Sequence, residues 1–431
     1  MKPTELRKLG NELHDYLWEM FEGLGRRERL EALSWYVTGL LLDGERKSTE
    51  PMAARLVDDA DEISAMRQRL QECVSISAWS EDVVLGRLAT KIEAELPAIE
   101  ALVIDDTGFP KKGRHSVGVQ RQYSGTLGRQ DNCQVATSLH LAGEQGSACI
   151  ALRLYLPEVW CSDPDRRHKA KVPDEIPFKK KWEIALEQID AALRWGVRRH
   201  VVLADAGYGE IGEFRDELDA RKLPYLVGIS GEPVVWPPQS NPRIPTKKSR
   251  IGRSRTRYLD PKAPPISVRE LSASLLFRKV SWRQGSRGWQ SSRFAAARIR
   301  TAHKHTNGAA PGESQWFLCE WPDGEKGPKK FWLSNLPART SLATLVRMAK
   351  LRWRVERDYQ ELKQEIGLDH FEGRTWRGFH HHATLCAVAH AFLALRRALF
   401  PPEPSEMDDL SGPPRLATGP AVLDRHLSAL P

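Results

Sequence analysis

Two short apolar runs in this chain end in acids: Ala101-Leu-Val-Ile-Asp-Asp106 and His200-Val-Val-Leu-Ala-Asp205. Short apolar runs bounded by turn-forming residues predict buried strands. Acids that end neighbouring strands can meet at one edge of a sheet, however far apart they stand in the chain. The two runs therefore predict a sheet with Asp106 and Asp205 at its edge.

A third acid stands on a predicted helix, in the stretch Lys350-Leu-Arg-Trp-Arg-Val-Glu-Arg-Asp-Tyr-Gln-Glu-Leu-Lys363. At about 100° per residue, Arg352, Glu356 and Lys363 fall within roughly 40° of one another on a continuous helix. The spacing predicts one long helix over about 341–366, with a carboxylate between two cations on one stripe.

Three converging carboxylates can hold two divalent cations, because Mg²⁺ prefers oxygen ligands and such pairs of ions catalyse phosphoryl transfer. The candidate catalytic and metal-binding acids are Asp106, Asp205 and Glu356. Asp105 competes with Asp106 for the first place, since strand alternation alone cannot choose between adjacent aspartates.

Each acid also has a structural explanation. Aspartate before Thr-Gly or Ala-Gly commonly opens a turn, and a helical ion pair around Glu356 contributes only about 0.3–0.5 kcal/mol. Taken singly, these structural roles are the more frequent ones. The order strand, strand, helix for all three acids together favours the metal site.

Composition indicates a globular protein with a polyanionic partner. The chain has 431 residues, 41% of them hydrophobic, a formal charge of +9 and a pI near 9.2, values that also fit many basic soluble proteins. Its six cysteines form no C-x-x-C pair, which disfavours a zinc ribbon or a disulfide framework. We expect neither a secreted nor a membrane-spanning protein, and a cytoplasmic location.

The pattern of hydrophobic and polar residues predicts an α/β protein with several parts. Its N-terminal helices could form a helix-turn-helix, although the pattern favours an ordinary bundle. We expect a helical part at 1–95, a first catalytic part at 96–230, an insertion with its own small sheet at 231–328, a second catalytic part at 329–400 and a disordered tail at 401–431. Within the first catalytic part, strands are expected near 101–105, 116–123, 132–141 and 148–156.

These residues resemble the DDE-type transposases of bacterial insertion sequences, over about 100–395. The similarity is to members with a Y-(2)-R-(3)-E-(6)-K signature, whose R, E and K fall on Arg352, Glu356 and Lys363. Alanine 349 stands at the tyrosine position, which puts one contact to the DNA backbone and a hairpin intermediate in question. By the same resemblance Asp106 and Asp205 are the first and second acids.

The resemblance implies an RNase H-like mixed sheet flanked by helices, with an N-terminal helical DNA-binding domain and a β-rich insertion. It implies cut-and-paste transposition, in which an end of the element is cleaved and its 3′ end joins target DNA. Two Mg²⁺ ions, with Mn²⁺ as a substitute, would be the cofactors. The implied partners are double-stranded DNA, both terminal inverted repeats and target, and a second copy in a homodimer associated with the bacterial nucleoid.

Two other functions compete with transposition. A nuclease or resolvase of the same superfamily would cleave DNA without joining it, and an inactive derivative would only bind DNA. The three acids argue against the inactive derivative.

Some of the cations are expected to contact DNA, and others are better explained as solvated. Arg352 and Lys363 would hold phosphate oxygens. Lys111 and Lys112 follow the first acid directly and are expected to contact DNA, against the alternative of a solvated loop. The basic run 247–257 is better explained as a solvated loop.

The sequence also leads to expectations for several histidine, tryptophan and tyrosine side chains. His380, His381 and His382 cannot chelate one ion together, because consecutive helical residues point about 100° apart, so packing is expected. Trp332 precedes the catalytic helix and is expected to pack in the core rather than stack on a base. Tyr359 lies on the stripe of Arg352 and is a candidate to supply the missing phenol.

Overall fold

The computed structural model describes residues 3–246, 256–285, 288–302 and 308–399. The predicted tail at 401–431 and most of the basic run 247–257 lie outside these residues. The chain divides into two compact units, the first comprising Met1–Glu100, Ile104–Arg198 and Arg354–Pro431, the second Ala101–Val103 and Arg199–Trp353. Strand β1 (Ile99–Pro110) contributes residues to both.

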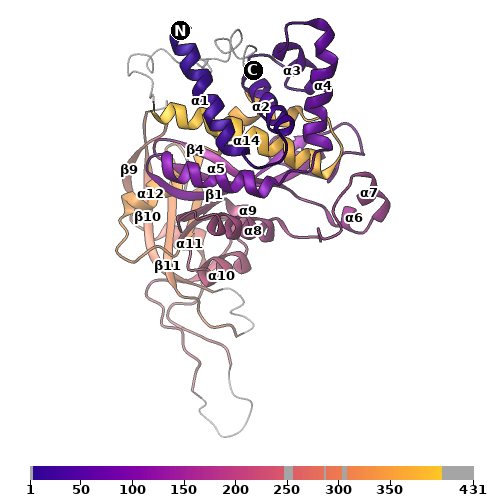
Figure 1. The fold of residues 1–431 in the computed structure, drawn as a ribbon. Coiled ribbons are helices and arrows are strands. Elements are labelled where there is room, and N and C mark those ends of the chain that lie inside the picture. The colour runs from indigo at the N-terminus through magenta and orange to yellow at the C-terminus, as the bar shows by residue number, and fades with distance from the viewer. Residues whose placement is uncertain (1–2, 247–255, 286–287, 303–307, 400–431) are drawn as a thin grey trace. The chain divides into compact units, whose positions relative to one another are not determined.

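The first unit begins with five helices, in agreement with the helical pattern over 1–95. Helix α14 (Trp376–Leu399) packs against α1, α2, α4 and α5 of this group and against a strand, so its residues are buried almost all round (Figure 1). Side chains at the N-caps of α4 and α5, Asp59 and Ser80, accept backbone hydrogen bonds. The helices are α1 (Pro3–Phe21), α2 (Arg27–Leu41), α3 (Thr49–Leu56), α4 (Ala60–Ser75) and α5 (Glu81–Glu95).

The strands of the first unit are largely antiparallel. They are the C-terminal part of β1, β2 (Gln120–Ser124), β3 (Arg129–Gly143) and β4 (Ser147–Leu154), with β3 pairing antiparallel with both β2 and β4. The strand predicted at 116–123 starts later, because Gly118 adopts a positive φ of 73° and Val117 bonds to the carbonyl of Arg374. Helices α6 (Glu158–Cys161), α7 (Pro164–Lys169) and α8 (Lys181–Arg194) follow β4.

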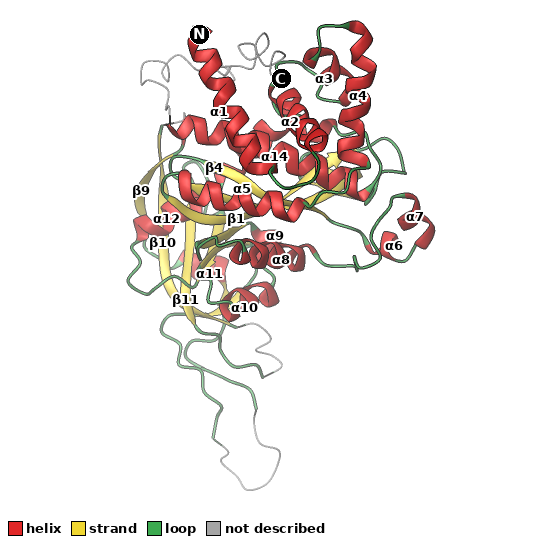
Figure 2. Ribbon diagram, in the orientation of Figure 1, coloured by secondary structure: helices red, strands yellow, loops and turns green. Residues whose placement is uncertain are grey.

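The second unit holds a mixed sheet, shown in yellow in Figure 2. Residues Ala101–Val103 of β1 pair in parallel with β5 (Val201–Ala204), and β5 pairs in parallel with β6 (Tyr225–Ile229). Helices α9 (Ala206–Gly209) and α10 (Gly212–Ala220) connect β5 to β6. The predicted α/β class with a mixed sheet and flanking helices is confirmed.

The insertion was expected to form its own small sheet, and this is wrong. Strand β12 (Lys330–Ser334) pairs antiparallel with both β6 and β11, so the strands of the insertion extend the sheet that contains β5. The strands are β7 (Val234–Trp236), β8 (Ile266–Ser267), β9 (Arg278–Arg283), β10 (Trp289–Thr301) and β11 (Ser314–Trp321), with helix α11 (Val268–Ala273) between β8 and β9.

The long helix predicted over 341–366 is interrupted. Helix α12 (Leu342–Leu351) is followed by its C-cap Arg352, and α13 (Trp353–Gln364) begins at the next residue, so the stripe that placed Arg352 with Glu356 is not on one continuous helix. Neither Gly nor Pro marks the break. Before the break Lys350 is bound to Glu320 in the second unit, and after it Asp358 is bound to His140 in the first.

No helix among the described residues is long and apolar enough to cross a membrane.

Candidate functional site

The adjacent aspartates of β1 face opposite sides of the sheet, because side chains alternate along a strand. Asp106 accepts a hydrogen bond from the Thr137 hydroxyl at 3.2 Å through Oδ1 and forms an ion pair with Lys181 through Oδ2. Thr137 lies on β3 and Lys181 begins α8. Asp106 is therefore on the face covered by α8.

The opposite face of β3 is covered by α13. The Tyr359 hydroxyl lies 2.6 Å from the Ser138 hydroxyl, and Asp358 Oδ2 lies 2.7 Å from His140 Nδ1. Since Ser138 follows Thr137, it points away from Asp106. Asp105 consequently shares its face with the helix that carries Glu356.

Glu356 is solvent-exposed in the first turn of α13, between buried Val355 and buried Asp358. Lys363, two turns later, donates to the carbonyl of Gly108 at 2.9 Å and to the Thr126 hydroxyl at 3.0 Å. Burial lowers the pKa of Lys363. The signature lysine is thus attached to β1 just beyond its two aspartates.

Lys111 and Lys112 differ in exposure. Lys111 Nζ donates to the carbonyl of Phe371 at 2.9 Å, and burial lowers its pKa, whereas Lys112 is exposed. Of this predicted pair, Lys111 has a structural role and Lys112 presents its charge to solvent.

The second acid lies in the second unit, directly after β5. Asp205 is the N-cap of α9, and its buried Oδ1 has no hydrogen-bond partner among the described residues. A Cβ on Gly209 would lie 1.9 Å from the carbonyl oxygen of Gly228, so the Asp-Ala-Gly-Tyr-Gly turn packs directly on β6. An unpaired buried carboxylate oxygen is costly, and a hard cation is a partner that would relieve the cost.

The candidate residues are distributed over both units. Asp105, Asp106, Glu356 and Lys363 belong to the first, Asp205 and Arg352 to the second. The described part of the chain contains no assembled group of three or more His, Cys, Asp or Glu side chains that could hold a metal.

Comparison with known proteins decides the family. A family model described as "DDE superfamily endonuclease" matches residues 19–289, which include Asp105, Asp106 and Asp205 and end before Glu356. The chain belongs to the DDE superfamily endonucleases. The resemblance drawn from the sequence motifs is thereby confirmed.

One similar protein is named "Probable transposase for insertion sequence element IS701", from Microchaete diplosiphon. It is 32% identical over 205 residues, which are 46% of this chain and 48% of that protein. The match thus spans about half the length of the curated relative.

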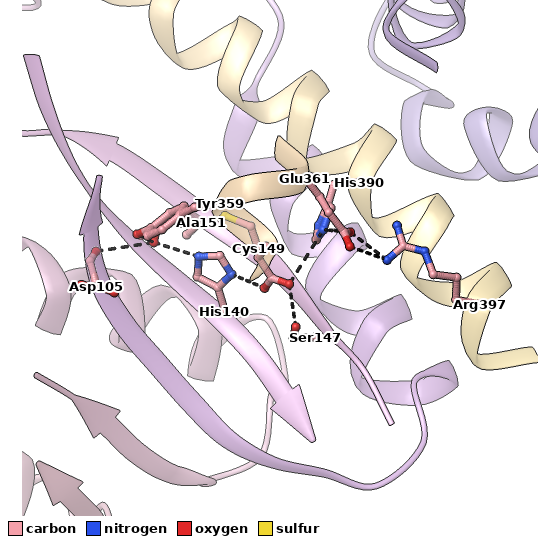
Figure 3. A network of polar contacts seen from close by, with 11 residues as sticks. Asp105, His140, Ser147, Cys149, Ala151, Tyr359, Glu361, His390 and Arg397 are labelled. Atoms are coloured by element: carbon pink, nitrogen blue, oxygen red, sulfur yellow. Dashed lines mark hydrogen bonds and ion pairs between the residues drawn. The ribbon is translucent and has the colours of Figure 1, made fainter. Parts of the chain in front are cut away.

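Helix α13 of this DDE endonuclease is held by two buried acids, Asp358 and Glu361, and Figure 3 labels Glu361 with its partners His390 and Arg397. Asp358 accepts hydrogen bonds from His140 and from the Ser147 hydroxyl at 2.6 Å. Glu361 lies 3.3 Å from His390 Nε2 and 2.8 Å from the Arg397 guanidinium of α14. The two acids are only 3% and 2% exposed, so their charges depend on these partners.

The charge states follow from these contacts. Burial alone would lower the pKa of His140, but neighbouring Cys149 and hydrogen-bonded Asp358 raise it to about 10. Burial would raise the pKa of Glu361, but His390 and Arg397 hold it well below its usual range. Both groups are therefore charged at neutral pH. This network has no signal in the helical pattern, since buried acids resemble solvated ones in sequence.

Tyr359 was a candidate for the missing signature phenol. Its hydroxyl is instead bound to Ser138 against β3, and burial raises its pKa well above the usual value. The contact points into the protein, so the phenol has a structural partner in place of DNA.

The three consecutive histidines pack as expected. His380 bonds to the carbonyl of Trp376, His381 stacks on Trp79 at 3.8 Å between ring centres, and His382 bonds to the Tyr36 hydroxyl at 2.9 Å. Burial lowers their pKa values to about 3, 4 and 4, respectively, so they are neutral at pH 7.

A largely enclosed cation in the second unit was missed by sequence reasoning. Lys350 Nζ donates to both carboxylate oxygens of Glu320, at 2.8 and 2.7 Å, and lies 4.4 Å from the Trp282 ring centre and 6.0 Å from that of Trp332. Burial lowers the pKa of Lys350. Trp332 therefore packs beside this cation, and Arg352 follows two residues later at the end of α12.

We predict that Asp358→Asn lowers the free energy of unfolding by about 3–5 kcal/mol, because it leaves the His140 cation buried without its counterion. Urea unfolding would measure the change. Glu31→Gln, which breaks the exposed pair with Arg27, is the control and should cost no more than about 1 kcal/mol. Equal effects of the two substitutions would contradict the inferred role of Asp358.

We also predict that the stabilisation from Glu361 depends on acidity. Its folded pKa is depressed, so its contribution is complete above the unfolded pKa of about 4.3 and is lost as the pH falls through and below that value. The difference in free energy of unfolding between wild type and Glu361→Gln should shrink from pH 6 to pH 3. A difference that stays constant or grows over this range would refute the prediction.

Proposed function

We propose that this chain is a DNA transposase that cleaves the end of a mobile element and joins the freed 3′ end to target DNA. The observation that carries the proposal is the parallel pairing of β1 with β5, in which Val103 stands opposite Leu203. Two residues after each stands an aspartate, and Asp205 has a buried, unpaired oxygen. The family and the printed name of the IS701 relative support the same conclusion.

The register supports Asp105 as the first metal-binding acid. Residues paired across two strands point to the same face, and side chains alternate, so Asp105 has the parity of Asp205 while Asp106 has the opposite parity. Asp106, the first choice from the sequence, already pairs with Lys181. We therefore propose Asp105, Asp205 and Glu356 as the ligands, and give Asp106 the role of positioning Lys181.

The donor set fits hard divalent cations, because it consists of carboxylates and includes a buried oxygen for which the described residues supply no hydrogen-bond partner. Two Mg²⁺ ions, or Mn²⁺ in their place, would activate the attacking oxygen and stabilise the leaving one when bound. Arg352 would bind phosphate oxygens as a fork and Lys363 as a point charge.

The proposed reaction has two steps. In hydrolysis, a water oxygen bonds to phosphorus and the P–O3′ bond at the element's end breaks, which leaves a 5′-phosphate and a 3′-hydroxyl. In transfer, that hydroxyl loses its proton and its oxygen bonds to a target phosphorus, while the P–O3′ bond of the target breaks and the leaving 3′-oxygen takes up a proton. A homodimer would bring both ends together.

The first test uses the purified protein, Mg²⁺ and a duplex that carries the ends flanking its own gene. We expect wild type to cleave at the element boundary and Glu356→Ala to give no product above background. A supercoiled target plasmid added to the same reaction separates the functions, because only a transposase joins the cleaved end to it. Cleavage without joining would favour the nuclease or resolvase.

The choice of first acid has its own test, in which Asp105→Asn and Asp106→Asn are compared in the cleavage assay. We expect Asp105→Asn to abolish cleavage, because it removes a metal-binding charge, and Asp106→Asn to retain measurable cleavage. Thermal melting of both variants controls for folding. Loss of cleavage in Asp106→Asn alone would return the role to Asp106.

A further inference from the structure

The stretch that follows the two aspartates of β1 is unusually free of acids. Residues 107–130 contain five Lys or Arg and no Asp or Glu, whereas the whole chain nearly balances 65 basic with 56 acidic residues. The five cations are Lys111, Lys112, Arg114, Arg121 and Arg129. A local excess of this kind, with no carboxylate to repel a polyanion, suits contact with phosphates.

One face of the β2–β3 hairpin presents part of this stretch to solvent. The register pairs Arg121 with Asn132 and Tyr123 with Gln130, so these four side chains share a face that carries no carboxylate. Arg121 is exposed, and Tyr123 is 63% exposed. The opposite face carries Arg129, whose guanidinium is 3.0 Å from the Asp131 carboxylate.

A basic loop is fixed beside this face. Asn132 Nδ2 donates to the carbonyls of Lys111 at 2.5 Å and Gly113 at 3.0 Å, and the backbone N–H of Lys111 donates to the Asn132 carbonyl. Lys112 and Arg114 are exposed on this loop. Because Asn132 is the cross-strand partner of Arg121, the loop and the hairpin face form one surface.

The same hairpin is tied to the helix of the third acid. Lys363 of α13 donates to the Thr126 hydroxyl in the β2–β3 turn and to the Gly108 carbonyl at the start of the acid-free stretch. Glu356 lies on the same helix, seven residues earlier. A ligand bound to the surface is thus held by an element attached directly to the candidate site.

We propose that Lys112, Arg114, Arg121 and Tyr123 form a docking surface for the sugar–phosphate backbone of duplex DNA next to the cleaved strand. The inference rests on the proposed function and names the surface that holds its substrate. Arginine forks match phosphate oxygens, lysine adds a point charge, and an exposed tyrosine ring packs on sugars or bases. The contacts are to the backbone, so the surface binds without regard to sequence.

Binding is measured in the Glu356→Ala background, without Mg²⁺, on a duplex that carries the element's end and on a random duplex. We expect Arg114→Gln and Arg121→Gln each to weaken binding to both duplexes and to reduce the slope of log K against log salt by about 0.9. Tyr123→Ser should weaken binding with little change of slope, because it removes no charge.

Arg129→Gln is the matched control, since Arg129 belongs to the same hairpin but is paired with Asp131 on the other face. It should keep the slope of the Glu356→Ala parent. Melting temperatures establish that each variant is folded. Unchanged slopes and affinities for both Arg114→Gln and Arg121→Gln would overturn the proposal, and would leave an acidic protein as the alternative partner of this face.

The cleavage and binding assays distinguish an error in the docking-surface proposal from an error in the proposed transposase function. If wild type cleaves the element's end but the arginine variants bind normally, the docking surface is wrong and the transposase stands. If wild type binds with a slope that depends on Arg114 and Arg121 but never cleaves, the surface is supported and the catalytic function fails.

Discussion

The arrangement of the first unit depends on the neutralisation of two carboxylates buried on one helix. Asp358 and Glu361 are almost fully enclosed, and a buried carboxylate without a partner would cost several kcal/mol. His140 and Ser147 on the strands satisfy Asp358, while His390 and Arg397 on α14 bind Glu361. Helix α13 can therefore occupy only the position in which strands and α14 supply these partners together, and its exposed Glu356 is fixed as a consequence.

Hydrogen bonding and burial likewise decide which cations are available to a ligand. Lys363 and Lys111 donate to main-chain carbonyls, and burial lowers the pKa of each. To bind a phosphate, each lysine would first have to give up its hydrogen bond to the protein, which costs free energy. The exposed cations of the loop and hairpin, such as Arg121, can bind a phosphate without this free-energy cost. Lys363 and Lys111 must therefore exchange a protein hydrogen bond for a phosphate contact, whereas the exposed cations need not.

The sequence predicted the elements that carry a strong local pattern. Strand β4 (Ser147–Leu154) lies close to its predicted range of 148–156, and the helical character of residues 1–95 follows from periodicity. The break at Arg352 was missed because no Gly or Pro marks it, and the partners bound on its two sides, Glu320 and His140, are distant in the sequence. The strands of the insertion were assigned to a separate sheet because pairing between β12 and β6 spans about a hundred residues and leaves no local signal. For the site, the candidate acids came from strand ends, but the proposal of Asp105 over Asp106 rests on the register against β5, which the sequence does not show.

Comparison of the buried acids with Asp205 supports the proposed metal site. This chain satisfies Asp358 and Glu361 with its own histidines, hydroxyl and guanidinium, in keeping with the rule that buried charges are paired. At Asp205 the described residues place no donor on the buried Oδ1, while the close packing of Gly209 on Gly228 holds the turn that buries it. Among the described residues, the buried carboxylate oxygens without a hydrogen-bond partner are Asp205 Oδ1 and Glu365 Oε2, and under the proposed function the oxygen of Asp205 would take a cation from solution.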